Sequence, residues 1–218
     1  MIAIRPFSPP DANAVYQIGA DTARYGDPVE LILNDRRLFI DIFMRPYLTH
    51  YPETCWVAEV DGQVVGYLTG CPDTASYEPL FRRAVLRAAR DVALFRYRIG
   101  WRTARAAVGF MREVLAHPPT PNLEQYPAHL HVNLAAPYRG QGAGRCLMLA
   151  YLDHLRDQGI PGAHLNTSDQ NTVAVHLYEK LGFTVLHRYH SPYQSIVSRK
   201  PVDGLLMGLR LDGTAPDL

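Results

Sequence analysis

Short stretches in which apolar and polar residues alternate predict strands in several parts of the chain. The clearest pair is formed by residues 55–60 and 63–70, which flank the dipeptide Asp61-Gly62. Asp-Gly is favoured in two-residue hairpin turns, so these stretches predict two antiparallel strands. Further strands are predicted at residues 2–5, 129–134, 163–167, 183–189 and 205–211.

Between the strands, apolar residues recur at intervals of three and four, as on one face of a helix. The helix that follows strand 129–134 carries such a stripe and should end near Gly159. Because this helix separates strands 129–134 and 163–167, the two strands should run parallel. A parallel pair beside an antiparallel hairpin indicates a mixed α/β sheet covered by helices. Other helices are predicted at about 8–24, from Pro28 to about Pro46 and at 170–181, and a polar, aromatic loop that borders a site is predicted at 189–201.

The helical pattern is different in an insertion at about 76–121. Its apolar residues step by four and three along two stripes, and the register between the stripes slips at Gly100. This predicts two helices, or one helix kinked at that glycine, whose narrow apolar seam packs against the body or against a second subunit. A homodimer through the insertion is therefore one alternative. The stripes are Phe81, Val85, Ala88, Val92, Phe95 and Ile99, and then Trp101, Ala104, Val108, Met111 and Leu115.

Positive charge is concentrated in the same insertion. Between Arg82 and Arg112 there are nine arginines and one acid, Asp91, although the whole chain has a net charge of only +1. The simplest interpretation is a solvated face, or ion pairs to the more acidic remainder of the chain. A subunit contact, a lid over an anionic substrate, or a nucleic-acid or membrane surface are the alternatives. The near-neutral total disfavours nucleic acid and membranes as partners.

Length and composition narrow the class of protein. The chain has 218 residues, of which 47% are hydrophobic and 20% charged, values typical of a folded domain with a proper core. We expect one domain over residues 1–218, interrupted only by the insertion. Cys55, Cys71 and Cys146 are widely spaced and odd in number, which favours a reducing, cytoplasmic setting over a disulfide framework. We see no secretory leader and no run of membrane-spanning length, so we expect a soluble intracellular protein.

A glycine-rich loop lies where strand 129–134 gives way to the next helix. Glycine lets the backbone approach a ligand closely, and the first turn of a helix offers free N–H groups and the positive end of its dipole. We therefore predict a phosphate site, most naturally for a pyrophosphate, at residues 139–145. The alternative is that the glycines only permit a tight turn. The loop consists of Tyr138, Arg139, Gly140, Gln141, Gly142, Ala143 and Gly144.

Two motifs resemble those of a known family. Residues 137–144 are similar to the acyl-CoA loop of the GNAT N-acetyltransferases, Arg/Gln-x-x-Gly-x-Gly/Ala. Residues 171–183 resemble that family's Asn-x-x-Ala-x-x-Leu-Tyr-x-x-Leu-Gly-Phe, and the hairpin around residues 65–67 lies where the family has its second and third strands. The resemblance implies the mixed central sheet of the GNAT fold. The helical insertion would then lie between the third and fourth strands. It also implies transfer of an acetyl group from acetyl-CoA to an amine of a small molecule or protein.

A narrower resemblance is carried by residues 126–133 and 71–74. They are similar to the acetyltransferase-like proteins related to the C-terminal domain of O-GlcNAc hydrolases. Membership of that branch does not imply catalysis. A non-catalytic acyl-CoA-binding module or scaffold of the same fold is therefore the main alternative.

The family resemblance also implies which residues hold acetyl-CoA. Backbone N–H groups of the glycine loop would bind its phosphates, with charge added by Arg139 or Arg145. The end of the preceding strand would pair with the pantetheine arm and polarise the thioester carbonyl, and Asn171 would bond to the same arm. The expected cofactor-binding residues are Leu134, Ala135, Arg139, Gly140, Gln141, Gly142, Ala143, Gly144, Arg145, Asn171 and Tyr178.

The catalytic residues are less directly indicated. Tyr178 occupies the family's position for the acid that protonates the departing thiolate, for which a phenol is suited; the alternative is a core tyrosine. His131 shares a strand face with His129, and a histidine can deprotonate an amine; the alternative is a structural histidine. Asp73, after the third strand, is a second candidate for the base.

A metal site is the other chemistry that the histidines suggest. His129, His131 and His164 lie on two neighbouring predicted strands, but no cysteine or acid adds a ligand at helical spacing. We therefore expect no metal. No motif identifies the acetyl acceptor, whose pocket should be formed by the first helices, the insertion and the loop before the last strand.

Overall fold

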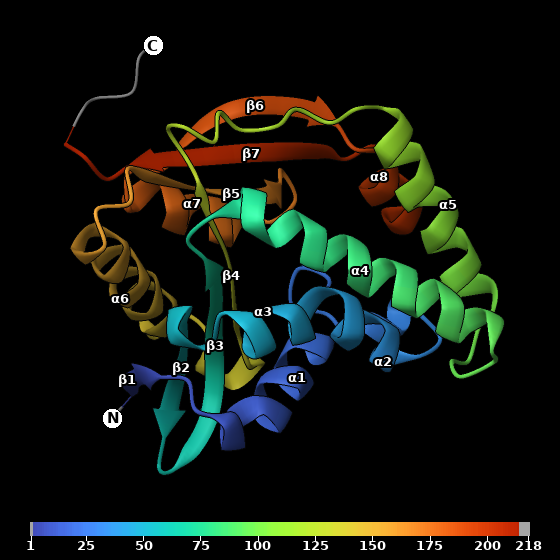
Figure 1. The fold of residues 1–218 in the computed structure, drawn as a ribbon, viewed down its shortest axis with the longest axis horizontal. Coiled ribbons are helices and arrows are strands. Elements are labelled where there is room, and N and C mark those ends of the chain that lie inside the picture. Colours follow the sequence, from blue (N-terminus) through green and yellow to red (C-terminus); the bar gives the residue numbers. More distant parts are fainter. Residues whose placement is uncertain (1, 214–218) are drawn as a thin grey trace.

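Seven strands form one mixed sheet in the computed structural model, in the order β1-β2-β3-β4-β5-β7-β6 (Figure 1). The structure describes residues 2–213, so residue 1 and residues 214–218 of the expected domain lie outside it. Only β4 and β5 are parallel neighbours, which confirms the mixed α/β class. The strands are β1 (Ala3–Pro6), β2 (Cys55–Val60), β3 (Gln63–Cys71), β4 (Ala128–Leu134), β5 (Gly162–Ser168), β6 (Thr184–His190) and β7 (Asp203–Arg210).

The predicted hairpin joins β2 and β3. Val60 pairs with Gln63, which leaves Asp61 and Gly62 as the two turn residues. Both have positive φ, 49° and 78°, the conformation that makes Asp-Gly favourable in this turn.

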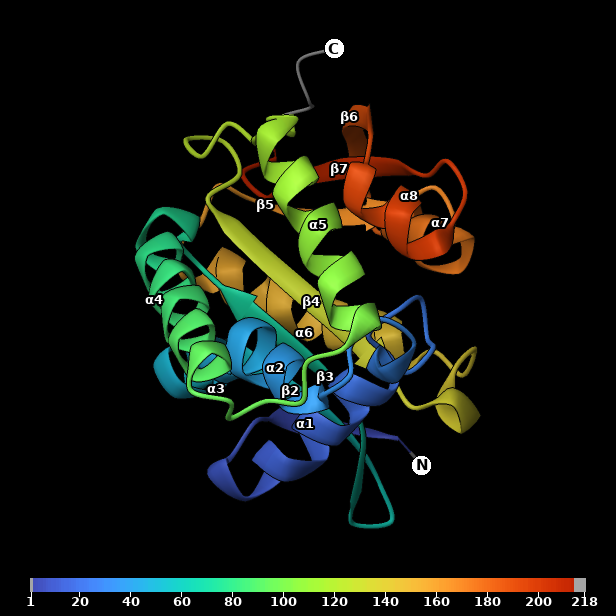
Figure 2. The same ribbon diagram turned by 90° about the vertical axis from the view of Figure 1, so that its right-hand side faces the viewer.

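Helices cover both faces of the sheet (Figure 2). On one face α6 packs across β2, β3 and β4, and α7 packs against β5; on the other face α1 and α3 pack against β3. The apolar stripe predicted for α6 is largely buried: Met148, Leu152 and Leu155 are at most 1% exposed, whereas Leu149 is only partly buried. Leu147 is buried beside them. The helices are α1 (Ala12–Asp21), α2 (Arg36–Phe39), α3 (Arg45–His50), α4 (Thr74–Ala93), α5 (Trp101–Leu115), α6 (Ala143–Asp157), α7 (Thr172–Lys180) and α8 (Pro192–Ser198).

Three helix predictions need correction. The first helix ends at Asp21 rather than near residue 24. The helix expected to end near Pro46 continues to His50, because this proline lies in the first turn of α3, where its missing N–H is tolerated. The expected loop 189–201 contains α8, which begins where the Ser191 side chain accepts a hydrogen bond from the Gln194 N–H.

The insertion forms two helices, α4 and α5, joined by residues 94–100, as the register slip at Gly100 predicted. The first stripe lies against the body over much of α4, where Ala88 is buried and the centroid of the Phe81 ring lies 5.7 Å from that of Phe43. The second stripe points outward: Trp101 is 74% exposed and Met111 59% exposed. The sequence pattern therefore predicted the helices correctly, whereas α5 packs against α8 through a different face.

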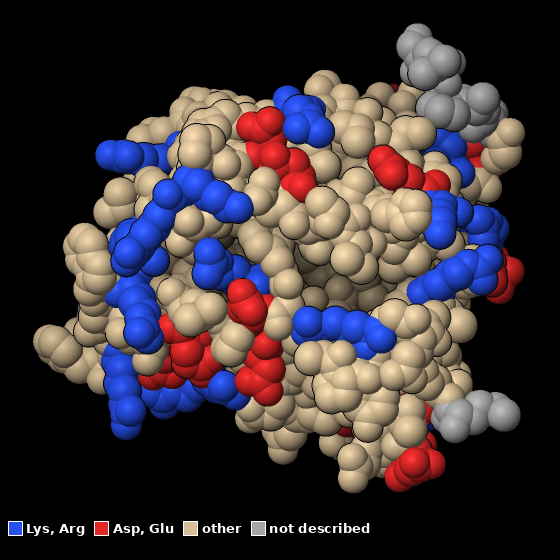
Figure 3. Space-filling view, turned by 180° about the vertical axis from the view of Figure 1, so that it is seen from behind, with Lys and Arg blue, Asp and Glu red and all other residues tan. Residues whose placement is uncertain are grey.

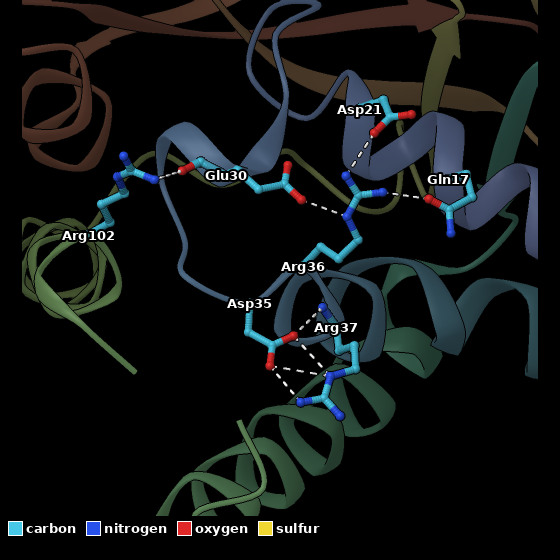
Figure 4. Close-up of polar contacts among 7 residues, drawn as sticks. All are labelled: Gln17, Asp21, Glu30, Asp35, Arg36, Arg37 and Arg102. Atoms are coloured by element: carbon cyan, nitrogen blue, oxygen red, sulfur yellow. Dashed lines mark hydrogen bonds and ion pairs between the residues drawn. The ribbon is translucent and has the colours of Figure 1, made fainter. Parts of the chain in front are cut away.

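Polar contacts connect the insertion to the body (Figure 4). Arg102 on α5 donates to the backbone oxygen of Glu30 (2.9 Å), and the Glu30 carboxylate pairs with Arg36 (2.6 Å). Arg36 in turn bonds to Gln17 and Asp21 on α1. Seen from behind, basic side chains gather along the flank that carries α5 and the connector (Figure 3). Between residues 2 and 213, no helix combines the length and apolar character needed to cross a membrane.

Candidate active site

The two parallel strands separate soon after they begin. β4 and β5 are paired only between Ala128 and Ala163 and between His129 and His164. Further along, β4 remains bonded to β3, and β5 to β7. The facing edges of the two strands therefore have backbone groups that no strand partner uses, and such groups need other hydrogen-bond partners. The sheet is thus open between the ends of β4 and β5. The glycine loop follows the end of β4, and the motif at residues 171–183 follows the end of β5.

A cavity of about 510 Å³ lies at this opening, on the face that α3 and α4 cover. Its volume falls within the range of small-molecule sites. Aromatic side chains from the helices form its walls, and the diverging strands form its floor. It is lined by Phe43, Tyr47, Thr74, Tyr77, Glu78, Phe81, Arg82, His129, Leu130, His131, His164, Leu165 and Asn166.

Tyr47 holds the two histidines of β4 together. Its hydroxyl lies 2.8 Å from Nε2 of His129 and 3.1 Å from Nε2 of His131. Asn133, two residues further along, donates to the hydroxyl of Tyr67 at 2.9 Å. The three polar side chains of β4 therefore share one face, as their alternation predicted. Sequence reasoning missed Tyr47, which is 82 positions from His129 and belongs to neither motif.

Both histidines are neutral at physiological pH. Burial lowers the pKa of His129 well below its usual range, and the nearby rings of His131 and His164 lower it further. His131 lines the cavity and is an exposed residue. The protein around its ring reduces its solvation, which lowers the pKa of His131, with a smaller contribution from His164. A neutral His131 can accept a proton.

Asp73 is placed at the start of α4. Its carboxylate accepts a hydrogen bond from the Ala75 N–H at 3.0 Å, so it caps the helix. The side chain is exposed and does not line the cavity, whereas the next residue, Thr74, does. Asp73, the second candidate for the base, thus stabilises the start of α4.

Tyr178 lies on α7, on the other face of the opened sheet. Its ring packs near Phe183, with centroids 6.0 Å apart, and the residue is only 8% exposed. Burial raises the pKa of Tyr178 to about 12, so the phenol keeps its proton at neutral pH. Among residues 2–213, no group forms a hydrogen bond with this hydroxyl. Asn171 precedes α7. Among residues 2–213, its side chain forms no capping hydrogen bond with this helix.

The glycine loop has the backbone that a phosphate site requires. Gly140 and Gly142 have φ of 74° and 86°, a left-handed conformation that favours glycine. A Cβ at either position would meet nothing within 4 Å, so conformation rather than lack of space selects glycine there. Gly142 is the N-cap of α6, and the N–H groups of residues 143–145 form its first turn. Such groups attract anions.

The two arginines of the loop are placed differently. Arg139 donates to the backbone oxygens of Leu134 (3.0 Å) and Gly26 (3.2 Å), so it braces the loop. Arg145 is exposed on the first turn of α6. Arg145 is therefore the better placed of the two to approach an anion.

The end of β4 leaves one useful backbone donor. The Ala135 N–H bonds to the Val65 oxygen on β3 at 2.9 Å. Successive N–H groups of a strand point to opposite edges, so the Leu134 N–H points toward the opening. Leu134 rather than Ala135 can thus pair with an extended ligand between the strands.

The histidines do not form a metal site in the described structure. Between residues 2 and 213, no group of three histidine, cysteine or acidic side chains is arranged to hold a metal ion. Nδ1 of His164 lies 2.8 Å from the backbone oxygen of Tyr126, and both ring nitrogens of His129 have hydrogen-bond partners.

Known proteins are similar to parts of this chain or to its fold. Mycothiol acetyltransferase of Nocardiopsis dassonvillei is 52% identical over 48 residues, which are 22% of this chain and 14% of that protein. The solved structure of SsHAT matches with a TM-score of 0.72 and 28% identity over 96% of this chain and 98% of that one. An acetyltransferase from Salmonella typhimurium, described as putative and solved with its cofactor acetyl-CoA, matches with a TM-score of 0.57 and 18% identity over 99% and 98% of the two chains.

The match to the curated relatives thus spans about a seventh of their length, while the structural matches cover nearly the whole chain. The profile of the acetyltransferase (GNAT) family matches residues 19–183, from the end of α1 to the end of the second motif. That is more than half of the chain, and it includes the opened strands, the glycine loop and Tyr178. The chain belongs to the acetyltransferase (GNAT) family.

Proposed function

We propose that this protein transfers an acetyl group from acetyl-CoA to the amine of a small molecule or a protein. One observation carries the proposal: the sheet opens between β4 and β5, with a candidate base on one face of the sheet and a candidate acid on the other. The proton-accepting His131 lies on the cavity side. The protonated phenol of Tyr178 lies on the side of α6 and α7.

The residues present are suited to acetyl-CoA. The first-turn N–H groups of α6 and exposed Arg145 would bind its phosphates. The Leu134 N–H and the Asn171 side chain would bond to its pantetheine arm. When bound, acetyl-CoA supplies the activated acetyl group as a thioester.

The protein's part is the movement of protons. As the amine nitrogen bonds to the acetyl carbon, its proton goes to His131; as the carbon–sulfur bond breaks, the Tyr178 hydroxyl gives its proton to the sulfur. Exchange with solvent returns both residues to their starting states. We favour His131 over Asp73 as the base, because His131 lines the cavity whereas the Asp73 carboxylate caps α4.

The second candidate function is an acyl-CoA-binding scaffold without turnover. It is favoured by the lowered pKa of His131, since a weaker base abstracts a proton less effectively. The resemblance to proteins related to the C-terminal domain of O-GlcNAc hydrolases points the same way. We propose that relationship on residues 71–74 and 126–133, which supply Thr74, His129 and Leu130 to the cavity.

A coenzyme A release assay over a panel of amines separates the two functions. For an acetyltransferase, Tyr178→Phe should lower kcat by roughly 10²–10⁴-fold, the usual contribution of a positioned acid. The dissociation constant of acetyl-CoA, measured by calorimetry, should stay within about three-fold, because the ring remains in place.

The control is Tyr97→Phe. Tyr97 also has a pKa of about 12, but it lies in the connector between α4 and α5 and donates to Asp41. This variant should retain full activity. Tight binding of acetyl-CoA without release by any amine would favour the scaffold.

A further inference from the structure

Four hydrogen bonds run from a backbone carbonyl to the ring of His131. The Thr74 hydroxyl lies 2.7 Å from the Pro127 oxygen and 2.7 Å from Nδ1 of His129. Nε2 of His129 lies 2.8 Å from the Tyr47 hydroxyl, which lies 3.1 Å from Nε2 of His131. The four side chains come from α3, α4 and β4, so the fold itself holds them in series.

The direction of the first two bonds follows from the Pro127 carbonyl. A carbonyl oxygen only accepts, so Thr74 must donate its single hydroxyl hydrogen to the Pro127 oxygen. The Thr74 oxygen then accepts from Nδ1 of His129, and that nitrogen must carry a hydrogen. Because a neutral imidazole has one ring hydrogen, Nε2 of His129 is left as an acceptor.

The remaining bonds follow in the same way. Tyr47 must donate its hydroxyl hydrogen to Nε2 of His129. Its oxygen can then only accept, so Nε2 of His131 carries the hydrogen of that ring. We infer that Thr74, His129 and Tyr47 are positioning residues that fix the tautomer of His131, leaving Nδ1 as the atom that receives the proton of the acceptor amine.

This inference rests on the proposed function for its purpose, although the hydrogen-bond directions do not depend on it. A free neutral histidine exchanges between two tautomers, and only one has a lone pair on Nδ1. The series of bonds excludes the other. It also stabilises the protonated ring, because the Nε2–H then forms a charge-assisted bond with the Tyr47 oxygen.

Other titratable groups face the same cavity. They are His164 from β5 and Tyr77, Glu78 and Arg82 from α4. Glu78 favours a protonated His131, and Arg82 opposes it. None of these groups bonds to the His131 ring among the described residues, so Tyr47 is the partner that determines its tautomer.

The direct test is ¹⁵N NMR of protein labelled at histidine nitrogens, with His131 assigned from the spectrum of His131→Gln. At neutral pH we expect a protonated Nε2 and a bare Nδ1 at His131, and the reverse at His129. Tyr47→Phe should abolish this preference at His131. A protonated Nδ1 at His131 in the wild type would overturn the inference, whether or not the protein acetylates any amine.

Kinetics add a test of the role in turnover. Tyr47→Phe should lower kcat/KM for the amine by at least about ten-fold, a share of what a positioned base contributes. The acidic limb of the pH profile should move to lower pH, because the protonated ring loses the oxygen that accepts its Nε2–H. The dissociation constant of acetyl-CoA should stay the same.

A second pair of variants guards against loss of folding at Tyr47. Thr74→Ser keeps the hydroxyl and should preserve both the His129 tautomer and the activity. Thr74→Val removes it, so the His129 signals should become mixed and kcat/KM should fall. Equal NMR spectra and equal activity in Ser and Val variants would show that the series does not orient the base.

Discussion

Two amphipathic helices, α6 and α5, use their apolar stripes in opposite ways. On α6 the stripe lies against three strands, and Leu147 and Leu155 are 0% exposed. On α5 the stripe faces outward, with Leu115 67% exposed. A stripe with helical spacing therefore indicates a helix but does not say what covers it.

The small residues of α5 explain the difference. Its buried side consists of Thr103, Ala106 and Gly109. A Cβ at Gly109 would lie 3.3 Å from the Cα of Tyr193, so the absence of a side chain lets α8 approach closely. Close approach of two helices thus determined the packing of α5, whereas burial of large side chains determined that of α6.

The largest difference in stability between the two helices is expected when a leucine of α6 and a methionine of α5 are truncated to alanine. Leu147→Ala removes a fully buried side chain from α6 and should lower the free energy of unfolding by about 2–5 kcal/mol. Met111→Ala on the outward stripe of α5 should change it by less than about 0.5 kcal/mol, because 59% of the residue is already exposed.

Urea denaturation of both variants measures the contrast. The positions are matched, since each is a helix-interior residue changed to alanine. A loss of more than about 2 kcal/mol at Met111 would mean that the stripe of α5 is covered in solution.

A smaller effect is expected where the insertion is tied to the body. Asp35 caps α2 and accepts hydrogen bonds from the Arg37 side chain and from the Arg98 N–H of the connector. The hydrogen bond from the Arg37 guanidinium lowers the pKa of Asp35 to about 2, with smaller contributions from the backbone N–H groups of Arg98 and Arg37. Asp35→Ala should lower the free energy of unfolding by roughly 1–2 kcal/mol, since it removes the cap and an ion pair whose arginine is largely solvated.

The sign of the pH dependence follows from the lowered pKa. A carboxylate with a depressed folded-state pKa stabilises the protein above its unfolded pKa of about 3.9, and that contribution is lost as the pH falls toward 2. The advantage of the wild type over Asp35→Ala should therefore shrink between about pH 4 and pH 2 in acid denaturation. Asp21→Ala, whose side chain is 56% exposed, is the control and should show little effect at any pH. If Asp35→Ala lowered the free energy of unfolding by the same amount at every pH, the stabilising role of the Asp35 charge would be contradicted.

The contrast between α6 and α5 also shows which features a sequence can predict. The Asp61-Gly62 turn and the glycine loop follow local rules of backbone conformation, and both were predicted. Residues 171–183 carry a spacing specific enough to indicate the family. These features together predicted the mixed sheet and its parallel pair, which the structure confirms. The contacts to acetyl-CoA stay a prediction.

What could not be predicted depends on contacts between distant segments. Tyr47 bonds to His129 and His131 across more than eighty positions, and no local pattern marks that pairing. Helix α8 has only seven residues, too few for a periodic stripe. The exposure of the α5 stripe depends on how α8 approaches, and α8 itself was missed.

The smallest effect is expected at Phe95, in the connector between α4 and α5. Phe95 has a φ of 56° and is 92% exposed, so it occupies a left-handed conformation without packing that offsets the strain. Asparagine adopts this conformation more readily than phenylalanine. Phe95→Asn should therefore raise the free energy of unfolding by roughly 0.5–1 kcal/mol, independently of protein concentration.

Tyr25→Asn is the matched control. Tyr25 has a similar φ of 51°, but its hydroxyl donates to Gln194 at 2.7 Å, so the relief of backbone strain should be offset by a lost contact. A lower free energy of unfolding for Phe95→Asn, with a shift from dimer to monomer in sedimentation, would instead mean that a second copy covers the connector. The exposed stripe of α5 would then be part of a subunit interface, and α5 would resemble α6 in burying its large side chains.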